Sequence, residues 1–193
     1  MTTTVVLAHK WKTLWDSDPH VLPLAIKPRV GQVQEAICTL LLNEITQNAL
    51  GLQAVFLHDA LVTLGLEKEN LATTLRPCLQ EAVTHLKGGT PPSLVWESLT
   101  DTLADRIPAV AAQQHARKPL RALARLQLRL GDDQLVPGLT CHQSKGREWN
   151  TVGIRLSGAD ASALALGLDP AQADHRALYV ALTRARLDTL ALI

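Results

Sequence analysis

Residues 134–156 read QLVPGLTCHQSKGREWNTVGIRL: a polar loop lies between two short apolar runs. Both runs, residues 134–142 and 151–156, are rich in aliphatic and β-branched residues, which predicts two strands. In open α/β sheets, ligands bind beyond the carboxyl ends of the strands, and this loop leaves a strand at such an edge. The stretch therefore predicts a sheet and also the place of a functional site on it.

The residues that follow complete the pattern of a parallel sheet. Residues 169–186, DPAQADHRALYVALTRAR, have the apolar spacing of a helix, with Asp169 as the expected N-cap and Pro170 in the first turn. DTLALI, residues 188–193, predicts a further strand. The order strand, loop, strand, helix, strand is typical of parallel α/β sheets.

The front of the chain predicts two more strands, and the middle predicts helices. TTTVVLA at residues 2–8 and HVLPLAIK at residues 20–27 have strand character, and both could join the same sheet. In the middle, apolar residues recur at spacings of three and four. We therefore expect an α/β domain formed by residues 1–30 and 132–193, with an all-helical subdomain inserted at residues 31–131.

Composition limits the class of protein. The 193 residues carry a formal net charge of +1, so any affinity for nucleic acid has to come from local clusters of charge. The three cysteines are widely separated, and His58 and His85 occur singly, so we expect no metal site. No apolar run is long enough to cross a bilayer, and the start lacks the pattern of a signal peptide. These features predict a cytoplasmic protein with no membrane partner.

The loop at residues 141–150, CHQSKGREWN, concentrates groups that bind phosphates and sugars. Gly146 would let backbone amides approach a phosphate, and Lys145 and Arg147 supply positive charge. Glu148 could accept a hydrogen bond from a sugar hydroxyl. The alternative is a polar loop whose charges are simply solvated, and residue types alone leave both interpretations open.

Residues 140–156, TCHQSKGREWNTVGIRL, contain the pattern Thr-x-His-x-x-Lys-Gly-x-Glu followed by a strand, and residues 174–186 read DHRALYVALTRAR. Together these segments resemble the last two sequence motifs of superfamily 1 DNA helicases of the UvrD/Rep kind. The matching positions are Thr140, His142, Lys145, Gly146, Glu148, Arg176 and 178–185. The resemblance implies a RecA-like P-loop NTPase fold with an inserted helical subdomain. It also implies ATP and Mg²⁺ as cofactors and single-stranded and duplex DNA as partners.

The resemblance implies roles for the matching residues. Arg184 looks like the arginine that reaches the γ-phosphate of ATP across the cleft between two RecA-like domains, where it stabilises charge in the transition state. Gly146 and Glu148 look like nucleotide contacts, with the glutamate at the ribose. The part of the loop that touches DNA in the family corresponds here to Thr140, His142 and Lys145.

Other residues of these motifs have less specific assignments. Arg176 lies eight residues before Arg184 and could face the same side of the helix, or it could be a structural ion-pair partner. Tyr179 and Leu182 are expected to pack within the protein. Trp149 adjoins the loop and could stack on a base, although most tryptophans are used in packing.

The front of the chain, TTTVVLAHKWKTL, looks like the motif that opens the second RecA-like domain in this family. His9 stands where relatives carry an arginine after the strand, and Lys10 follows it. Lys10 is therefore the candidate for a second contact with the nucleotide phosphates.

A G-x-x-x-x-G-K-[ST] phosphate loop does not occur in the sequence. Without the lysine and hydroxyl of that loop there is no cradle for ATP and Mg²⁺. We therefore expect these residues to be the C-terminal domain of a longer helicase, with the phosphate loop in an N-terminal RecA-like domain of the same protein, and to be inactive as an ATPase alone. The alternative is a non-catalytic DNA-binding or protein-interaction module that retains the helicase fold.

A predicted helix at the end of the helical block has a basic face. Its arginines fall at a spacing of four, and leucines form the complementary apolar stripe. These arginines could contact DNA phosphates, or they could form a solvated helix face. They are Arg117, Arg121, Arg125 and Arg129.

Overall fold

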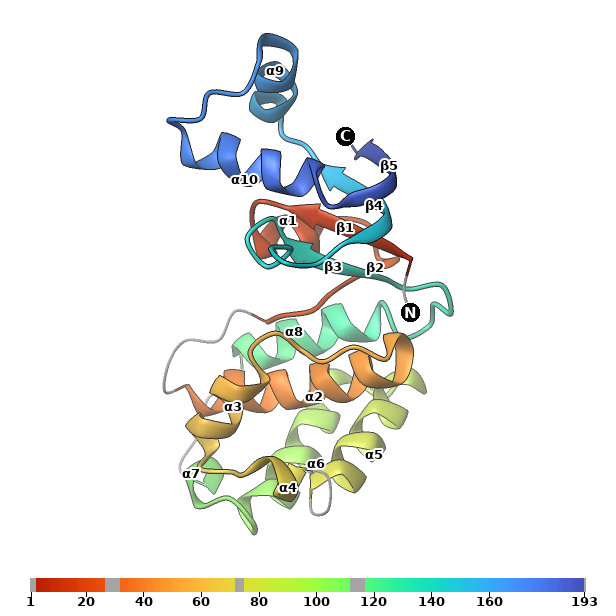
Figure 1. Ribbon diagram of the computed structural model, residues 1–193. Coiled ribbons are helices and arrows are strands. Elements are labelled where there is room, and N and C mark those ends of the chain that lie inside the picture. Colours follow the sequence, from red (N-terminus) through yellow and green to blue (C-terminus); the bar gives the residue numbers. More distant parts are fainter. Residues whose placement is uncertain (1–2, 27–31, 72–74, 112–116, 193) are drawn as a thin grey trace. The chain divides into compact units, whose positions relative to one another are not determined.

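The computed structural model describes residues 3–26, 32–71, 75–111 and 117–192. The chain forms two compact units (Figure 1). The sheet unit consists of residues 1–23 and 134–193, and the helical unit consists of residues 24–133. In sequence, the helical unit lies between the second and third strands of the sheet.

Five strands form one sheet in the order β2-β3-β1-β4-β5. Every neighbouring pair is parallel, which confirms the predicted parallel α/β sheet. The β5 strand begins three residues before the predicted start at Asp188, and β2 is shorter than predicted. The strands are β1 (Thr4–Ala8), β2 (Val21–Pro23), β3 (Val136–Thr140), β4 (Trp149–Arg155) and β5 (Ala185–Leu192).

The centre of the sheet is β1, whose apolar residues are buried because strands flank it on both sides. Close packing also explains a glycine in β3. A Cβ atom on Gly138 would lie 2.8 Å from Val21 Cγ1 and 3.3 Å from the Cα of Pro23, so a side chain there would push against the backbone of β2. Pro23 itself is tolerated because β2 is an edge strand, where one row of backbone hydrogen bonds is missing.

The helix α10 (Ala173–Leu182) begins three residues later than predicted, because its N-cap is Gln172 and not Asp169. Asp169 instead closes a turn before the helix. Its carboxylate accepts hydrogen bonds from the backbone N–H of Ala171 at 2.8 Å and from Gln172 Nε2 at 3.3 Å. An Asp-Pro pair favours turns as well as N-caps, and here the turn is formed.

Two other helices belong to the sheet unit, α1 (Trp11–Asp16) and α9 (Gly158–Leu166). The α9 helix was not predicted, although its start carries a clear signal. Ser157 Oγ accepts a hydrogen bond from the backbone N–H of Asp160, and Asp160 accepts one from the backbone N–H of Ser157 at 2.8 Å. This reciprocal arrangement is a capping box, and it satisfies two donors at the helix start.

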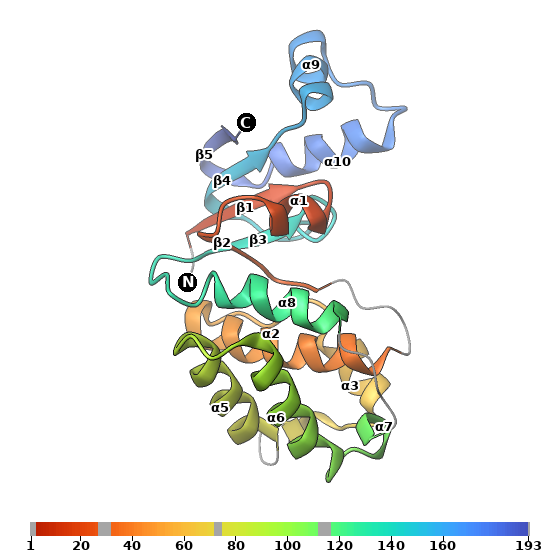
Figure 2. The same cartoon turned by 180° about the vertical axis from the view of Figure 1, so that it is seen from behind.

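The helical unit contains no strand among the residues that the structure describes. Its central helix is α2, in which residues 36–46 are all buried, and a helix buried on all sides forms the core of a domain. Figures 1 and 2 show α8 running alongside α2. The helices are α2 (Val33–Leu50), α3 (Leu57–Leu64), α4 (Lys68–Asn70), α5 (Arg76–Lys87), α6 (Pro92–Ala104), α7 (Pro108–Ala111) and α8 (Arg117–Gln127).

The predicted four-arginine face of α8 is wrong at one position. Arg129 lies just after the helix, is only 2% exposed, and donates from Nη1 to the carbonyl of Arg125 at 2.9 Å. Arg121 and Arg125 are exposed, and the side chain of Arg117 lies outside the described residues. The chain turns after Gln127, so the spacing of four no longer keeps the last arginine on the same face.

Within the described ranges, none of the helices has the length and apolar character that a membrane span requires.

Candidate functional site

All five strands point the same way, so the residues that follow them lie at the carboxyl edge of the sheet and the residues that precede them lie at the amino edge. His9 follows β1 and Cys141 follows β3 at the carboxyl edge. Glu148 precedes β4 and Arg184 precedes β5 at the amino edge. The structure therefore divides the predicted site residues between two opposite edges.

The loop at residues 141–148 connects these edges, because it leaves the carboxyl end of β3 and enters the amino end of β4. It begins as a compact turn. The N–H of Ser144 donates to the carbonyl of Thr140 at 3.1 Å, and Ser144 Oγ donates to the carbonyl of Cys141 at 2.7 Å. Gly146 has φ +74°, a left-handed conformation that favours glycine, and it lets the chain change direction toward Glu148.

Thr140 stabilises this loop instead of facing solvent. Its residue is 5% exposed, its Oγ1 accepts a hydrogen bond from the backbone N–H of Gln143, and the same hydroxyl contacts Gln143 Oε1. The Thr140 hydroxyl is therefore engaged inside the loop, and the role of Thr140 as a DNA contact stays a prediction. His142 and Lys145 are exposed and remain the predicted DNA-facing residues.

The amino edge brings Glu148 and Arg184 together. The backbone N–H of Trp149 donates to the carbonyl of Arg184 at 3.0 Å, so the residues before β4 and β5 are held side by side. Trp149 itself is 9% exposed and packs in the core, which leaves its ring unable to stack on a base. Glu148 forms an ion pair with Arg186, with 3.0 Å between Oε2 and Nε, and both side chains are more than half exposed.

Arg184 lies just beyond the end of α10 and turns back onto it. Its Nε donates to the carbonyl of Val180 at 3.0 Å, and its Nη2 donates to Thr183 Oγ1 at 3.0 Å. A guanidinium has five N–H donors, and these are the two that described residues engage. The side chain is half-buried, so it is positioned by its own helix and keeps donors for a ligand.

Two neighbours on α10 differ from their predicted roles. Arg176 donates to the carbonyls of Pro170 at 2.7 Å and Ala171 at 2.9 Å. Its hydrogen-bond partners are thus backbone carbonyl groups, and not the carboxylate expected for an ion pair. Tyr179 was expected to pack, yet it is 61% exposed. The buried face of the helix is formed by the small and aliphatic residues Ala177, Leu178 and Ala181.

Lys10 lies at the other edge from Arg184. It lines a pocket of about 330 Å³ with His9, Arg155 and Asp160. Leu7 of β1 pairs with Ile154 of β4, and Ala185 of β5 pairs with Trp149 of β4. These two positions of β4 are five residues apart, which corresponds to about 17 Å along the strand. Lys10 and Arg184 therefore lie at opposite edges of the sheet, and a second contact of Lys10 with the nucleotide phosphates stays a prediction.

Asp160 is the residue of this edge that the sequence prediction missed. Its carboxylate accepts from Ser157 and lies 3.0 Å from His9 Nε2, so it links the end of β1 to the start of α9. Burial opposes the charge of Asp160, but the hydrogen bonds from Ser157 and the interaction with His9 outweigh it and lower the pKa of the carboxyl group. The S-x-x-D pattern at residues 157–160 was the available signal.

Cys141 follows β3 at the carboxyl edge, and its side chain is buried. Burial raises the pKa of the Cys141 thiol to about 12, so this thiol stays protonated and unreactive at neutral pH. Across the described part of the chain, no three His, Cys, Asp or Glu side chains gather as a metal ion would need. The arrangement of the amino edge suits hydrogen bonding and charge stabilisation instead.

No protein-family model matches the chain, and no curated protein matches its sequence.

Proposed function

We propose that the chain is the second RecA-like domain of an ATP-dependent DNA helicase of the UvrD/Rep kind. In this proposal it completes the ATP site of an N-terminal RecA-like domain of the same protein, which supplies the phosphate loop and the Mg²⁺ site. Both domains together would couple ATP hydrolysis to translocation on single-stranded DNA and to unwinding of duplex DNA. The parallel sheet is compatible with this type of fold.

The observation that carries the proposal is the pairing of Glu148 and Arg184 at the amino ends of adjacent strands. The bond between Trp149 N–H and the Arg184 carbonyl fixes their backbones, while both side chains keep hydrogen-bonding capacity toward solvent. Arg184 would donate to the γ-phosphate oxygens when the two domains close, where it stabilises the charge that develops during phosphoryl transfer. Glu148 would accept from the ribose hydroxyl, and Gly146, which has open space around it, would lie beside the nucleotide.

The loop at residues 141–148 offers a route for coupling. It carries exposed His142 and Lys145 near one edge and Glu148 at the other, and the hydrogen bonds of Ser144 keep its first turn rigid. A shift of Glu148 on nucleotide binding would therefore move the residues that contact the strand. Exposed Arg121 and Arg125 of the helical unit would add contacts with DNA phosphates.

The test compares the full-length gene product with its Arg184→Ala variant. We expect ATPase activity that single-stranded DNA stimulates, and a loss of about 1,000-fold or more in the variant, because a cross-domain arginine is worth that much in phosphoryl transfer. Affinity for a fluorescent ATP analogue should change by only a few-fold, since the phosphate loop and Mg²⁺ site hold the ground state.

Arg176→Ala is the matched control, because Arg176 is an exposed arginine of α10, the helix that Arg184 follows, and it donates to carbonyl groups of the loop before that helix. Its ATPase activity should remain within a few-fold of wild type. A full-length product without ATPase activity, or an Arg184→Ala variant as active as wild type, would contradict the proposal and favour a binding module that retains the fold.

A further inference from the structure

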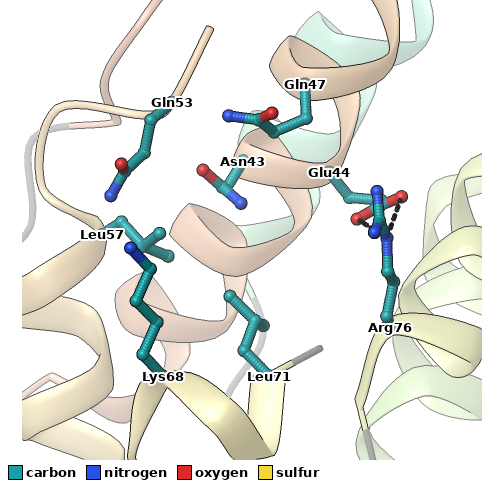
Figure 3. Close-up of a pocket in the computed structure, with 8 residues that line it drawn as sticks. All are labelled: Asn43, Glu44, Gln47, Gln53, Leu57, Lys68, Leu71 and Arg76. Carbon is teal, nitrogen blue, oxygen red and sulfur yellow. Dashed lines mark hydrogen bonds and ion pairs between the residues drawn. The ribbon is translucent and has the colours of Figure 1, made fainter. Parts of the chain in front are cut away.

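The helical unit contains a polar pocket of about 300 Å³ that the helicase proposal does not use (Figure 3). It lies between α2, the segment that follows α2, and the helices α3, α4 and α5. All of its residues belong to the helical unit. A volume of this size is at the lower end of the range for small-molecule sites.

Asn43 presents an unused donor to this pocket. The residue is 7% exposed, and its Oδ1 accepts a hydrogen bond from the backbone N–H of Ala54 at 3.1 Å. Because that N–H can only donate, the oxygen of the amide has to face Ala54 and the NH₂ group has to face away from it. Among the described residues the NH₂ group has no hydrogen-bond partner, so its two donors are free to bind a ligand in the pocket. The pocket is where a ligand could satisfy it.

Glu44 lines the same pocket, but its negative charge is already compensated. Its side chain is 5% exposed, and Gln80 Nε2 donates to Oε1 at 2.9 Å. Asn48 Nδ2 donates to the same oxygen at 3.2 Å, and Arg76 Nε lies 3.4 Å from the carboxylate. Arg76 and Glu44 therefore cancel in charge, as the dashed lines between them in Figure 3 indicate.

Lys68 leaves one positive charge in the pocket. It has no ion pair with any described residue, and Figure 3 shows its side chain extending toward the amides of Gln53 and Asn43. Leu57 and Leu71 add apolar surface beside the ammonium group. The pocket thus combines the ammonium group of an exposed lysine, an amide donor without a protein partner and two leucines.

We infer that this pocket binds a small carboxylate with a compact apolar body. The carboxylate group accepts hydrogen bonds from the Lys68 ammonium and the Asn43 NH₂ group, and the apolar body lies against Leu57 and Leu71. A carboxylate carries a single negative charge, which matches the single uncompensated positive charge of the pocket. A phosphate monoester carries about −1.5 to −2 at neutral pH and matches it less well. The inference is independent of the helicase proposal.

The test is calorimetric titration of the full chain with benzoate, with its uncharged isostere benzamide and with phenyl phosphate. Benzoate should bind saturably with one site per chain. Benzamide should bind at least about ten-fold more weakly, because a hydrogen bond to a charged group contributes that much or more. Phenyl phosphate should be weaker than benzoate.

Two variants assign the binding to this pocket. Lys68→Gln should weaken benzoate binding about ten-fold or more, whereas Lys87→Gln, on the exposed end of α5 and about 16 Å along the helix from Arg76, should leave it within two-fold. Asn43→Asp keeps the acceptor for Ala54 and replaces the donor by a negative charge, so it should abolish binding, with circular dichroism as the check that it folds.

The inference would be overturned by no saturable binding of benzoate, by equal binding of benzamide, or by Lys68→Gln binding benzoate as wild type does. Tighter binding of phenyl phosphate than of benzoate would reject the carboxylate as the ligand class.

Discussion

Thr140 and Asp160 at the carboxyl edge of the sheet are buried, whereas Glu148 at the amino edge is exposed and Arg184 is half-buried. The buried pair accept hydrogen bonds from the backbone of their own loop or helix. The other pair interact with an exposed arginine and with the end of the preceding helix. All four are polar residues next to strand ends, yet they perform different physical tasks.

The difference lies in which interactions the protein loses when each side chain is removed. A buried acceptor that is deleted leaves donors without partners, which costs about 1–3 kcal/mol per group. An exposed ion pair that is deleted costs little, because water replaces the partner. Substitutions at the carboxyl edge should therefore reduce stability, and substitutions at the amino edge should reduce function while stability is nearly unchanged. The effects below run from the largest to the smallest.

Asp160→Ala should lower the free energy of unfolding of the sheet unit by about 2 kcal/mol. The change removes the acceptor for the N–H and Oγ of Ser157 and the partner of His9, so the capping box of α9 is lost. The measurement is urea denaturation followed by tryptophan fluorescence. A Trp96→Phe background places every remaining tryptophan in the sheet unit, because Trp96 is the tryptophan of the helical unit.

Asp174→Ala is the matched control for this change. Asp174 also lies in the first turn of a helix, but it is exposed and belongs to no capping box. It should cost less than about 0.5 kcal/mol. Equal losses in the two variants would show that Asp160 acts only through the helix dipole, and the distinction between the edges would weaken.

The stabilisation by Asp160 should depend on pH in one direction. Because the pKa of its carboxyl group is lowered in the folded protein, the stabilisation is present above the unfolded pKa and is lost as the pH falls through the folded pKa. The difference in unfolding free energy between wild type and Asp160→Ala should therefore shrink as the pH falls below about 4. Asp169, whose pKa is also lowered, is present in both proteins and cancels in this difference. A difference that grows on acidification would contradict the assignment.

The inner strands β1 and β3 could be predicted from the sequence because they are short, mostly apolar and buried, as parallel strands covered on both faces are. The parallel direction followed from the alternation of strands with a loop and a helix. The prediction was less accurate at element ends. Asp169 and Pro170 suit a helix start and a turn equally, and hydrogen bonds to Ala171 and Gln172 decide for the turn.

The candidate site was only partly accessible to such reasoning. The sequence motifs identify Thr140, Glu148 and Arg184 as candidate site residues, but they carry no information on burial. In the structure Thr140 is buried, whereas Glu148 is exposed and Arg184 is half-buried. Lys10 follows β1 whereas Arg184 precedes β5, so the common direction of the strands places them at opposite edges. The contact between His9 and Asp160 joins residues that are far apart in the sequence, so nothing in the sequence near His9 predicts it. The nucleotide and DNA roles stay predictions.

Thr140→Val should lower the free energy of unfolding of the sheet unit by about 1 kcal/mol. Valine keeps the β-branched shape that suits β3 and removes the hydroxyl that the N–H of Gln143 donates to. Thr140→Ser retains the hydroxyl and should recover most of the hydrogen-bond contribution. If both variants were as stable as wild type, the hydroxyl would not stabilise the loop, and Thr140 would again be available as a DNA contact.

The smallest effect is expected at the amino edge, for the pair formed by Glu148 and Arg186. A double-mutant cycle with Glu148→Ala and Arg186→Ala should give a coupling free energy below about 0.5 kcal/mol, because both side chains are more than half exposed and solvent screens them. Raising the NaCl concentration should reduce it further. A coupling above about 2 kcal/mol would make Glu148 a structural partner of Arg186. In that case its carboxylate would be engaged within the protein, as that of Asp160 is. The proposal that it accepts a hydrogen bond from a ribose hydroxyl would then lose its physical basis.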